Sequence, residues 1–239
     1  KIFKNKIYNI QSTSAAAPIV SGISLTSVGS AGIADIYNNL IGDIKAPNAG
    51  TNTAASPAVR GMSFTSTTAS SSLNVSYNTI SLDASSTGAN FGSCGVFATT
   101  SATATTAVLN LRNNVIENLS TPKGTGFAVA YQRSSTTLTN YGAASDRNLF
   151  FAGGPCASRL IYYDGTNALQ TLAAYKALAT LAPRDANSVT EDPNLLSNVG
   201  GSANFLHVNS GTATQIEGSG VVIAGITDDF DGNARNAAT

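Results

Sequence analysis

The sequence predicts an all-β fold, a solenoid in which short parallel strands stack from one coil to the next. The first observation is a repeat, because a short apolar unit centred on an Asn recurs five times in the first two thirds of the 239 residues. The second is a period-two alternation of apolar and polar residues, which is typical of strands with one buried face. The third is a hydrophobic content of 42%, which argues against intrinsic disorder.

The repeated unit is anchored on an Asn, and successive anchors lie 34, 39, 36 and 34 residues apart. A period of this length is typical of solenoids, propellers and other repeat arrays. The five anchors are Asn5, Asn39, Asn78, Asn114 and Asn148. Since each coil of such a solenoid contributes strands too short to form a sheet alone, equivalent strands of successive coils are expected to pair in parallel, about 4.8 Å apart.

Two further units recur within each period. A unit in which Gly precedes an apolar residue is found at 19–25, 59–64, 93–98 and 125–130, and a third short run precedes the anchors at 33–36, 73–75 and 108–111. One period therefore holds about three short strands separated by turns. The Ser, Thr, Ala, Gly and Pro tracts between them are interpreted as turns and outward edges of the coils.

The apolar residues that follow the anchors are expected to stack in the core. These are Ile7, Ile41, Ile80 and either Val115 or Ile116. The anchor Asn itself is expected at a corner between strands, because Asn tolerates a left-handed backbone better than most residues. Stacked Asn side chains can also pass amide hydrogen bonds along a ladder, so we assign the anchors a structural role.

The pattern changes after Tyr163. Apolar residues at helical spacing predict a short helix within 167–181, with Thr166 or Asn167 as its N-cap and Pro183 after its end. The prediction is therefore a set of β-coils over 1–163 and a short helix with a closing region over 164–239, both within one domain.

The alternation around the anchor Asn and around the recurring Gly resembles that of right-handed parallel β-helix proteins of pectate-lyase-like architecture. The closing region resembles that of secreted surface β-helix proteins common in the Bacteroidetes. Its first segment matches at Asp185, Ser188, Val189, Asp192 and Pro193, and its second matches at Asp229, Asp231, Gly232 and Arg235. The resemblance implies a right-handed parallel β-helix with a C-terminal cap, located outside the cell or on its surface.

Composition excludes some classes of partner. The 13 basic and 13 acidic residues balance, so no electrostatic feature favours nucleic acid or an anionic membrane surface. No apolar stretch approaches the roughly 18 residues of a membrane span. The two cysteines, Cys94 and Cys156, are expected on units two coils apart, too distant for a disulfide, and are predicted to be free and buried.

Catalytic candidates are weak. Asp43, Asp83 and Glu117 follow successive anchors and might line one face, as a glycosidase carboxylate pair would require. Their spacing drifts, however, and no Asp doublet occurs in the coils. Arg112 and Arg147 lie near anchors, but no acidic cluster accompanies them as a lyase would need. These residues are interpreted mainly as solvated outward positions.

The C-terminal segment contains a weak metal-binding candidate. Asp228, Asp229 and Asp231 cluster before Gly232, and such oxygen ligands suit calcium. The order of an EF-hand loop is absent, so the alternative is a turn in which an Asp caps backbone amides and Arg235 pairs with a carboxylate. The single His207 cannot form a His-based metal cluster and is expected to be an ordinary strand residue.

These observations predict an extracellular structural or adhesive β-helix, in a surface layer or filament, which self-associates or binds surface glycans. Two alternatives stay open: a polysaccharide lyase or glycoside hydrolase, and a non-catalytic glycan-binding module. In the absence of Trp, sugar stacking would depend on tyrosines, and Tyr37 and Tyr77 could form an outward aromatic column, although such columns more often pack between coils.

Overall fold

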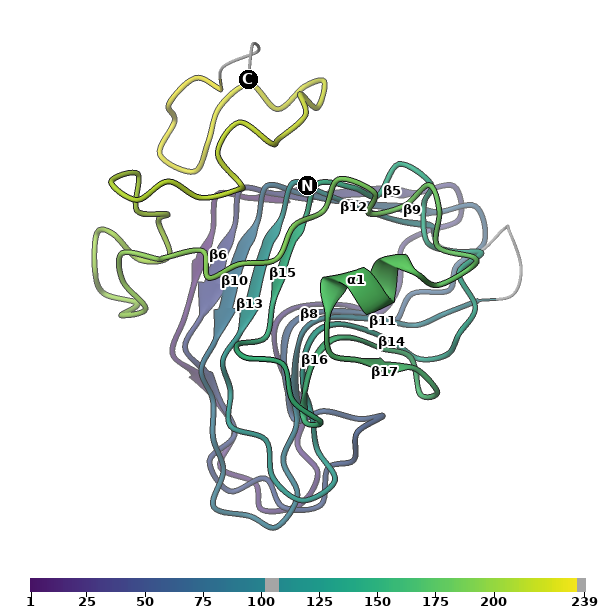
Figure 1. The fold of residues 1–239 in the computed structure, drawn as a ribbon, viewed down its shortest axis with the longest axis vertical. Helices are drawn as coiled ribbons and strands as arrows, with labels where there is room; N and C mark the ends of the chain where they lie inside the picture. The colour runs from purple at the N-terminus through teal and green to yellow at the C-terminus, as the bar shows by residue number, and fades with distance from the viewer. Residues whose placement is uncertain (102–107, 236–239) are drawn as a thin grey trace.

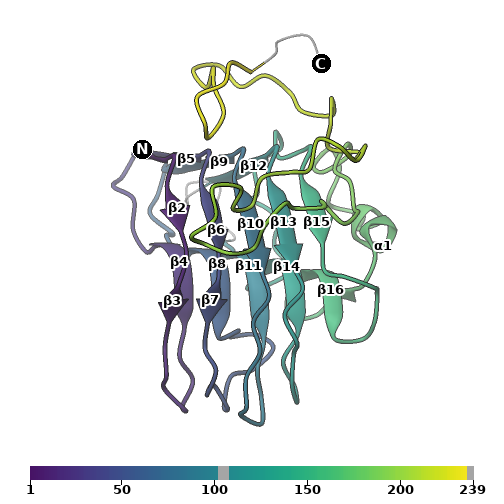
Figure 2. The same cartoon turned by 90° about the vertical axis from the view of Figure 1, so that its left-hand side faces the viewer.

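The chain folds as a parallel β-solenoid of about four turns, and the predicted fold class is confirmed. The structure is a computed structural model, and it describes residues 1–101 and 108–235. Figure 1 looks along the stack of coils, and Figure 2 shows equivalent strands of successive coils side by side. Within the described residues no helix is long and apolar enough to cross a membrane.

Three main sheets run along the solenoid, one for each strand predicted per period. Sheet A contains β1 (Ile2–Phe3), β5 (Ile33–Tyr37), β9 (Ser72–Ser76) and β12 (Val108–Arg112) in that order. Sheet B contains β2 (Lys6–Ile7), β6 (Leu40–Gly42), β10 (Thr79–Leu82), β13 (Val115–Asn118) and β15 (Leu149–Phe151). Sheet D contains β4 (Val20–Leu25), β8 (Val59–Phe64), β11 (Ser93–Ala98), β14 (Ala128–Arg133), β16 (Arg159–Tyr163) and the antiparallel β17 (Ala168–Leu169). The small sheet C joins β3 (Ile10–Gln11) to β7 (Ile44–Lys45).

The predicted core stack is present and selects Ile116 over Val115. Parallel register aligns Ile7, Ile41, Ile80, Ile116 and Phe150 in one column. Apart from the half-buried Ile7, these side chains are at most 1% exposed. The column fills the space between sheet B and sheet D, and its burial is the main favourable term in folding the coils.

The recurring Gly of the second unit faces this column. A Cβ at Gly61 would lie 2.4 Å from Ile80 Cγ2, and one at Gly95 would lie 2.3 Å from Ile116 Cγ2. Side chains are excluded there because the strands of sheet D pack directly on the isoleucines. The next coil departs from the prediction, since Ala130 and not Gly126 follows in register.

The anchor Asn residues form the predicted ladder. The Nδ2 of Asn39 donates to Asn78 Oδ1 at 2.8 Å, and Asn78 donates in the same way to Asn114 at 3.0 Å. Each backbone N–H of these residues donates to the same oxygen of the next coil at 3.1 Å. The expected left-handed backbone lies one residue earlier, at Lys4, Asn38, Tyr77, Asn113 and Arg147, with φ between 54° and 59°.

The C-terminal end of the ladder is closed by Asp185. Asn148 Nδ2 donates to Asp185 Oδ1 at 3.1 Å, and the Asn148 backbone N–H donates to Ser188 Oγ at 3.0 Å. Val189 then pairs with Leu149 as a parallel bridge. The segment Asp185–Val189 thus replaces the next coil, which gives the closing motif a physical role.

The helix is shorter than predicted. It spans α1 (Leu172–Lys176), and Thr171 is its N-cap, accepting a hydrogen bond from Ala174 N. Tyr175 is fully buried at the end of the core, and Figure 1 shows α1 lying across that end of the stack. The N-cap lies later than the predicted Thr166 or Asn167. All three residues are suitable caps, but Ala168 and Leu169 form β17, so the helix begins only after Thr171.

Candidate functional site

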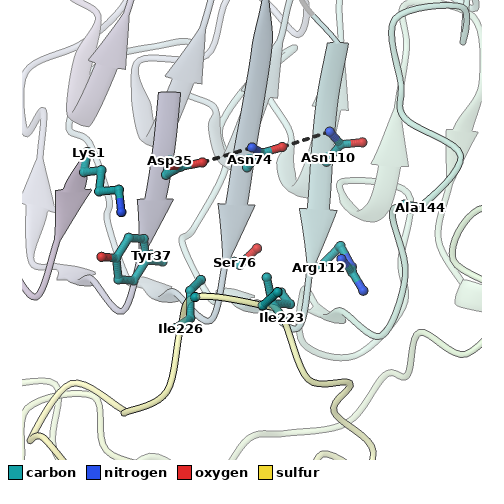
Figure 3. Close-up of a pocket in the computed structure, with 12 residues that line it drawn as sticks. Lys1, Asp35, Tyr37, Asn74, Ser76, Asn110, Arg112, Ala144, Ile223 and Ile226 are labelled. Atoms are coloured by element: carbon teal, nitrogen blue, oxygen red, sulfur yellow. Dashed lines mark hydrogen bonds between the residues drawn. The ribbon is translucent and has the colours of Figure 1, made fainter. Parts of the chain in front are cut away.

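A groove of about 310 Å³ lies over the outer face of sheet A. Its floor is a row of polar side chains from equivalent positions of three coils, drawn in Figure 3. Asn110 Nδ2 donates to Asn74 Oδ1 at 3.0 Å, and Asn74 Nδ2 donates to Asp35 Oδ1 at 3.0 Å. Since an amide has two N–H donors and two acceptor lone pairs, each member keeps capacity to bind a ligand.

A second row runs beside the first, two residues further along each strand. Tyr37, Ser76 and Arg112 occupy it in register. The Tyr37 ring stacks on Phe3 with centroids 5.0 Å apart and an interplanar angle of 12°. Arg112 is half-buried, and its guanidinium has no hydrogen-bond or ion-pair partner within residues 1–101 and 108–235. The groove floor therefore combines amides, a hydroxyl, a carboxylate and a cation without a partner in the part of the chain that the structure describes.

The wall of the groove is apolar and comes from the C-terminal segment. Ile223 and Ile226 face the floor in Figure 3, and residues 223–226 line the groove. They belong to a segment that runs back along the solenoid over 216–235, which we call the strap. A second hollow of about 460 Å³ lies on the strap itself, between residues 216–227 and Tyr77.

The strap is held by the five left-handed residues that precede the anchors, which we call the corner row. Arg147 Nη1 donates to Ser219 O at 2.6 Å, and Asn113 exchanges hydrogen bonds with the Val221 backbone at 2.7 and 3.1 Å. These contacts hold residues 219–221 of the strap against the corners at Asn113 and Arg147.

Further along the corner row, Tyr77 Oη donates to Val221 O at 2.6 Å, and Asn38 Nδ2 donates to Asp228 O at 2.8 Å. Lys4 pairs with Asp228 at 2.6 Å. Every member of the corner row, from Lys4 to Arg147, therefore contacts the strap.

Tyr37 and Tyr77 do not form an outward aromatic column. Tyr37 belongs to the groove floor, whereas Tyr77 is a corner residue, so the two are not equivalent in the repeat. The guanidinium of Arg235 lies 3.7 Å from the Tyr77 ring centroid, which is a cation–π contact. Tyr77 thus supports the strap.

The three carboxylate candidates do not align. Register places Gly42 and Ser81 beside Glu117, while Asp43 lies one residue later with φ of 51° and pairs with Lys45. Glu117 is 3% exposed and accepts a hydrogen bond from Ser81 Oγ at 2.5 Å. Burial raises the pKa of the Glu117 carboxyl, and the charges of Asp192 and Asp83 raise it further.

The aspartates of the strap have separate partners. Asp228 pairs with Lys4, and Asp231 Oδ2 lies 2.7 Å from His207 Nε2. Asp229 Oδ1 accepts from Asn233 N at 2.8 Å, which is the predicted Asx-type turn. The described residues contain no group of three or more His, Cys, Asp or Glu side chains that could hold a metal ion. Calcium binding by the strap stays a prediction, which titration calorimetry with Ca²⁺ would test.

Arg235 does not form the predicted ion pair with a carboxylate among the described residues. Its Nη2 donates to Asn38 Oδ1 at 2.7 Å, and its Nε donates to the backbone O of Asp228 at 3.0 Å. Arg235 therefore adds a further contact between the strap and the corner row. His207, expected in a strand, lies between the turn at Leu206 and the isolated bridge of Val208 with Leu195, with Nδ1 3.0 Å from Phe205 O.

A buried polar cluster closes the core beneath α1. Asp185 Oδ2 accepts hydrogen bonds from Tyr141 Oη at 2.7 Å and Tyr175 Oη at 2.8 Å, and Oδ1 accepts from Ser188 Oγ at 2.7 Å. Burial raises the pKa of the Asp185 carboxyl, although these donors oppose the shift. The cluster is enclosed and lies apart from the groove, so it serves folding.

The cysteines are both free, as predicted. Cys94 is buried, and desolvation raises the pKa of its thiol to about 12. Cys156 is exposed, so the prediction of burial is wrong for this residue. It lies in the turn before β16 rather than in a strand, and its backbone forms an isolated antiparallel β-bridge with Arg159.

Sequence reasoning missed the groove because it depends on the strap. The polar row was visible as Asp35, Asn74 and Asn110, each two residues before a strand end in equivalent units. No sequence signal places residues 223–226 over that row, since the strap belongs to no repeat.

No protein-family model, curated protein or solved structure matches the chain. The fold itself assigns the chain to the class of parallel β-solenoids.

Proposed function

We propose that this chain is a structural or adhesive protein of the extracellular surface, and that the groove over sheet A binds glycans without turning them over. The observation that carries the proposal is the hydrogen-bonded row Asp35, Asn74 and Asn110 on an otherwise open face. Donors and acceptors repeat there at the coil spacing of about 4.8 Å. A polymer with regularly repeated hydroxyl groups is the ligand class that suits such a row.

The second row and the wall support the same ligand class. Arg112 offers a guanidinium that has no partner among residues 1–101 and 108–235, which favours sugars that carry a carboxylate or sulfate. Ile223 and Ile226 provide an apolar side against which the nonpolar face of a sugar ring can pack. In the described part of the chain, the groove lining contains a single carboxylate, Asp35. Glycosidases require two carboxylates, so binding is favoured over hydrolysis.

An extracellular location is supported by composition and by resemblance. Charged residues make up only 11% of the chain, and Ser, Thr and Asn are abundant in it. The repeats and the closing region resemble those of pectate-lyase-like and secreted Bacteroidetes surface β-helices. A rigid stack with one open polar face suits adhesion to a surface polysaccharide.

A glycan array with the purified protein tests the proposal. We expect binding to a subset of acidic or neutral polysaccharides, strongly reduced in the double variant Asn74→Ala/Asn110→Ala and unchanged in Thr51→Ala, which alters an exposed residue outside the groove. Equal binding by all three proteins would contradict the assignment of the groove.

The enzyme alternative has one specific observation in its favour. Glu117 is a buried carboxyl with a raised pKa near two other carboxylates, an environment that general acids use. Incubating the protein with acidic and neutral polysaccharides and measuring new reducing ends or unsaturated products checks it. Activity lost in Asp43→Ala, Asp83→Ala or Glu117→Ala would replace the adhesive proposal with catalysis.

A further inference from the structure

A second polar hollow lies beside Arg147, at the end of the stack where Figure 2 shows α1. It has a volume of about 450 Å³ and lies between α1, residues 187–190 and the start of the strap. We call it the end hollow. It shares no lining residue with the groove over sheet A.

Two cations from different elements line the end hollow. The half-buried Arg147 belongs to the corner row, and its Nη1 donates to Ser219 O at 2.6 Å. Lys176 is the last residue of α1, and its Nζ donates to Ala186 O at 2.9 Å and to Ser188 O at 2.7 Å. A guanidinium has five N–H donors and an ammonium has three, so both side chains keep donors for a ligand.

The charges of these two cations are not neutralised by an ion pair within the described ranges. Their acceptors are backbone carbonyls, and two nearby carboxylates are bound to amides. Asp146 accepts from the N and Nδ2 of Asn187, both at 2.7 Å, and Glu191 accepts from the N and Nε2 of Gln215. Neither carboxylate is part of the lining, so the end hollow presents positive charge to a ligand.

The remaining lining residues are polar and neutral on one side of the end hollow. Because the amide nitrogens of Asn187 and Gln215 are bound to carboxylates, their carbonyl oxygens are the groups left to accept hydrogen bonds. The exposed Thr190 adds a hydroxyl. Such acceptors suit the hydroxyl groups of a ligand, whereas the two cations suit an anionic group. Since Arg147 and Lys176 come from different elements, a tetrahedral oxyanion, with oxygens in several directions, fits them better than a planar carboxylate.

We propose that the end hollow binds a tetrahedral oxyanion, a sulfate or phosphate group, carried by a molecule with hydroxyl groups such as a sugar ester. Arg147 and Lys176 donate to the oxyanion, and Asn187, Thr190 and Gln215 contact the hydroxyl groups. This site is independent of glycan binding over sheet A, because the two hollows have no residue in common.

Titration calorimetry of the intact protein with glucose 6-sulfate, glucose 6-phosphate, sodium sulfate and glucose tests the ligand class. We expect saturable binding of both esters, which weakens as salt is added, and none of glucose. Sulfate alone is expected to bind roughly tenfold more weakly than its ester, because it lacks the hydroxyl contacts. Equal affinity for sulfate and the ester would identify the free ion as the ligand and overturn the assignment of the hydroxyl contacts. Binding of glucose as tight as that of its esters would overturn the oxyanion site.

Two substitutions test the cations. Arg147→Asn removes the guanidinium and introduces a residue that tolerates the left-handed backbone, and Lys176→Gln removes the ammonium. Each is expected to weaken binding of glucose 6-sulfate by roughly tenfold or more. Lys123→Gln removes an exposed charge outside the end hollow, and Asn113→Gly removes strap contacts without changing charge. Both controls are expected to bind like the parent.

Hydrogen exchange of the unmodified protein locates the ligand without relying on the stability of a variant. Glucose 6-sulfate should slow exchange of the amides of residues 187–190 and Ser219 and leave β8 unchanged. The proposal is overturned if no saturable binding is found, or if Lys123→Gln or Asn113→Gly weakens binding as much as Arg147→Asn. Slower exchange confined to β5 and β9 would place the ligand on sheet A and overturn it as well.

Discussion

The Asn ladder and the corner row lie one residue apart along the chain, yet they are built on opposite principles. The ladder residues Asn39, Asn78, Asn114 and Asn148 are at most 1% exposed, and each repeats the hydrogen bonds of the others. The corner row is irregular: it contains two asparagines, a lysine, a tyrosine and an arginine, each with its own contact to the strap.

This difference shows where the fold alone does not determine residue identity. A left-handed backbone costs about 1–2 kcal/mol for most residues and suits Asn or Gly best. Lys4, Tyr77 and Arg147 occupy that conformation nonetheless, and their side chains contact Asp228, Val221 O and Ser219 O of the strap. The ladder therefore holds the coils together, while the corner row is specialised for one attached segment.

The largest loss of stability is expected from a substitution in the core of the coils. Ile80→Asp places an unpaired carboxylate in a column that is 1% exposed, at a cost of several kcal/mol out of a typical total stability of about 5–15 kcal/mol. Circular dichroism should show loss of the cooperative β-sheet transition. Thr51→Asp, which adds the same charge on the surface, is the control, and equal melting of both variants would refute the core register.

A neighbouring pair of asparagines separates the ladder from the corner row. Asn39→Ala removes a side chain that donates to Asn78 Oδ1, Ile2 O and Tyr37 O. These acceptors are then left unpaired, at a cost of about 1–3 kcal/mol for each buried group. We expect a loss of at least about 2 kcal/mol in urea unfolding. Asn38→Gly keeps the left-handed backbone and removes only the strap contact, so it should cost about 1 kcal/mol or less. Similar losses for the two variants would remove the distinction.

The Asp185 carboxyl at the C-terminal end of the ladder adds a pH dependence to the free energy of unfolding. Because the pKa of Asp185 is raised, the folded chain still holds this proton at pH values where the unfolded chain has released it. Stability is therefore highest below the unfolded pKa of about 4 and falls as the pH rises through the raised pKa.

Asp185→Asn should flatten this fall in unfolding free energy, measured with urea from about pH 3 to 7. Glu117 titrates with the same sign because its pKa is raised too, so Glu117→Gln is needed to isolate the remaining slope. An unchanged slope in Asp185→Asn would mean that this carboxyl does not titrate with folding.

The coils could be predicted because their energetics repeat. Burial of Ile41, Ile80 and Ile116 and the hydrogen bonds of the ladder recur with each period, so five weak signals reinforce one another. Two errors arose where the repeat is ambiguous. At 38–39 and 113–114 two Asn residues are adjacent, so the sequence does not show which of them has the left-handed backbone. Gly126 matches the recurring Gly in its sequence pattern, but Ala130 occupies the position equivalent to Gly95 in the next coil.

The groove could be predicted only in part, for a related reason. Asp35, Asn74 and Asn110 repeat, so their alignment follows from register. The strap contacts join residues 72 to 224 positions apart and occur once each, so no periodicity reports them. Arg235 illustrates the limit: the sequence indicated an ionic partner, but the stacked Tyr77 ring and the Asn38 amide come from two different coils.

The smallest effect on global stability is expected at the strap. Arg235→Ala removes a partly exposed cation–π contact and two hydrogen bonds, together worth about 1 kcal/mol or less, because solvent screens such contacts. Hydrogen exchange should accelerate over the strap and remain slow in β10 and β13. Segments held by few contacts open at lower free energy than the core. A loss as large as that of Asn39→Ala would instead make the strap part of the same cooperative unit as the ladder, and the corner row would then be a folding element like the one beside it.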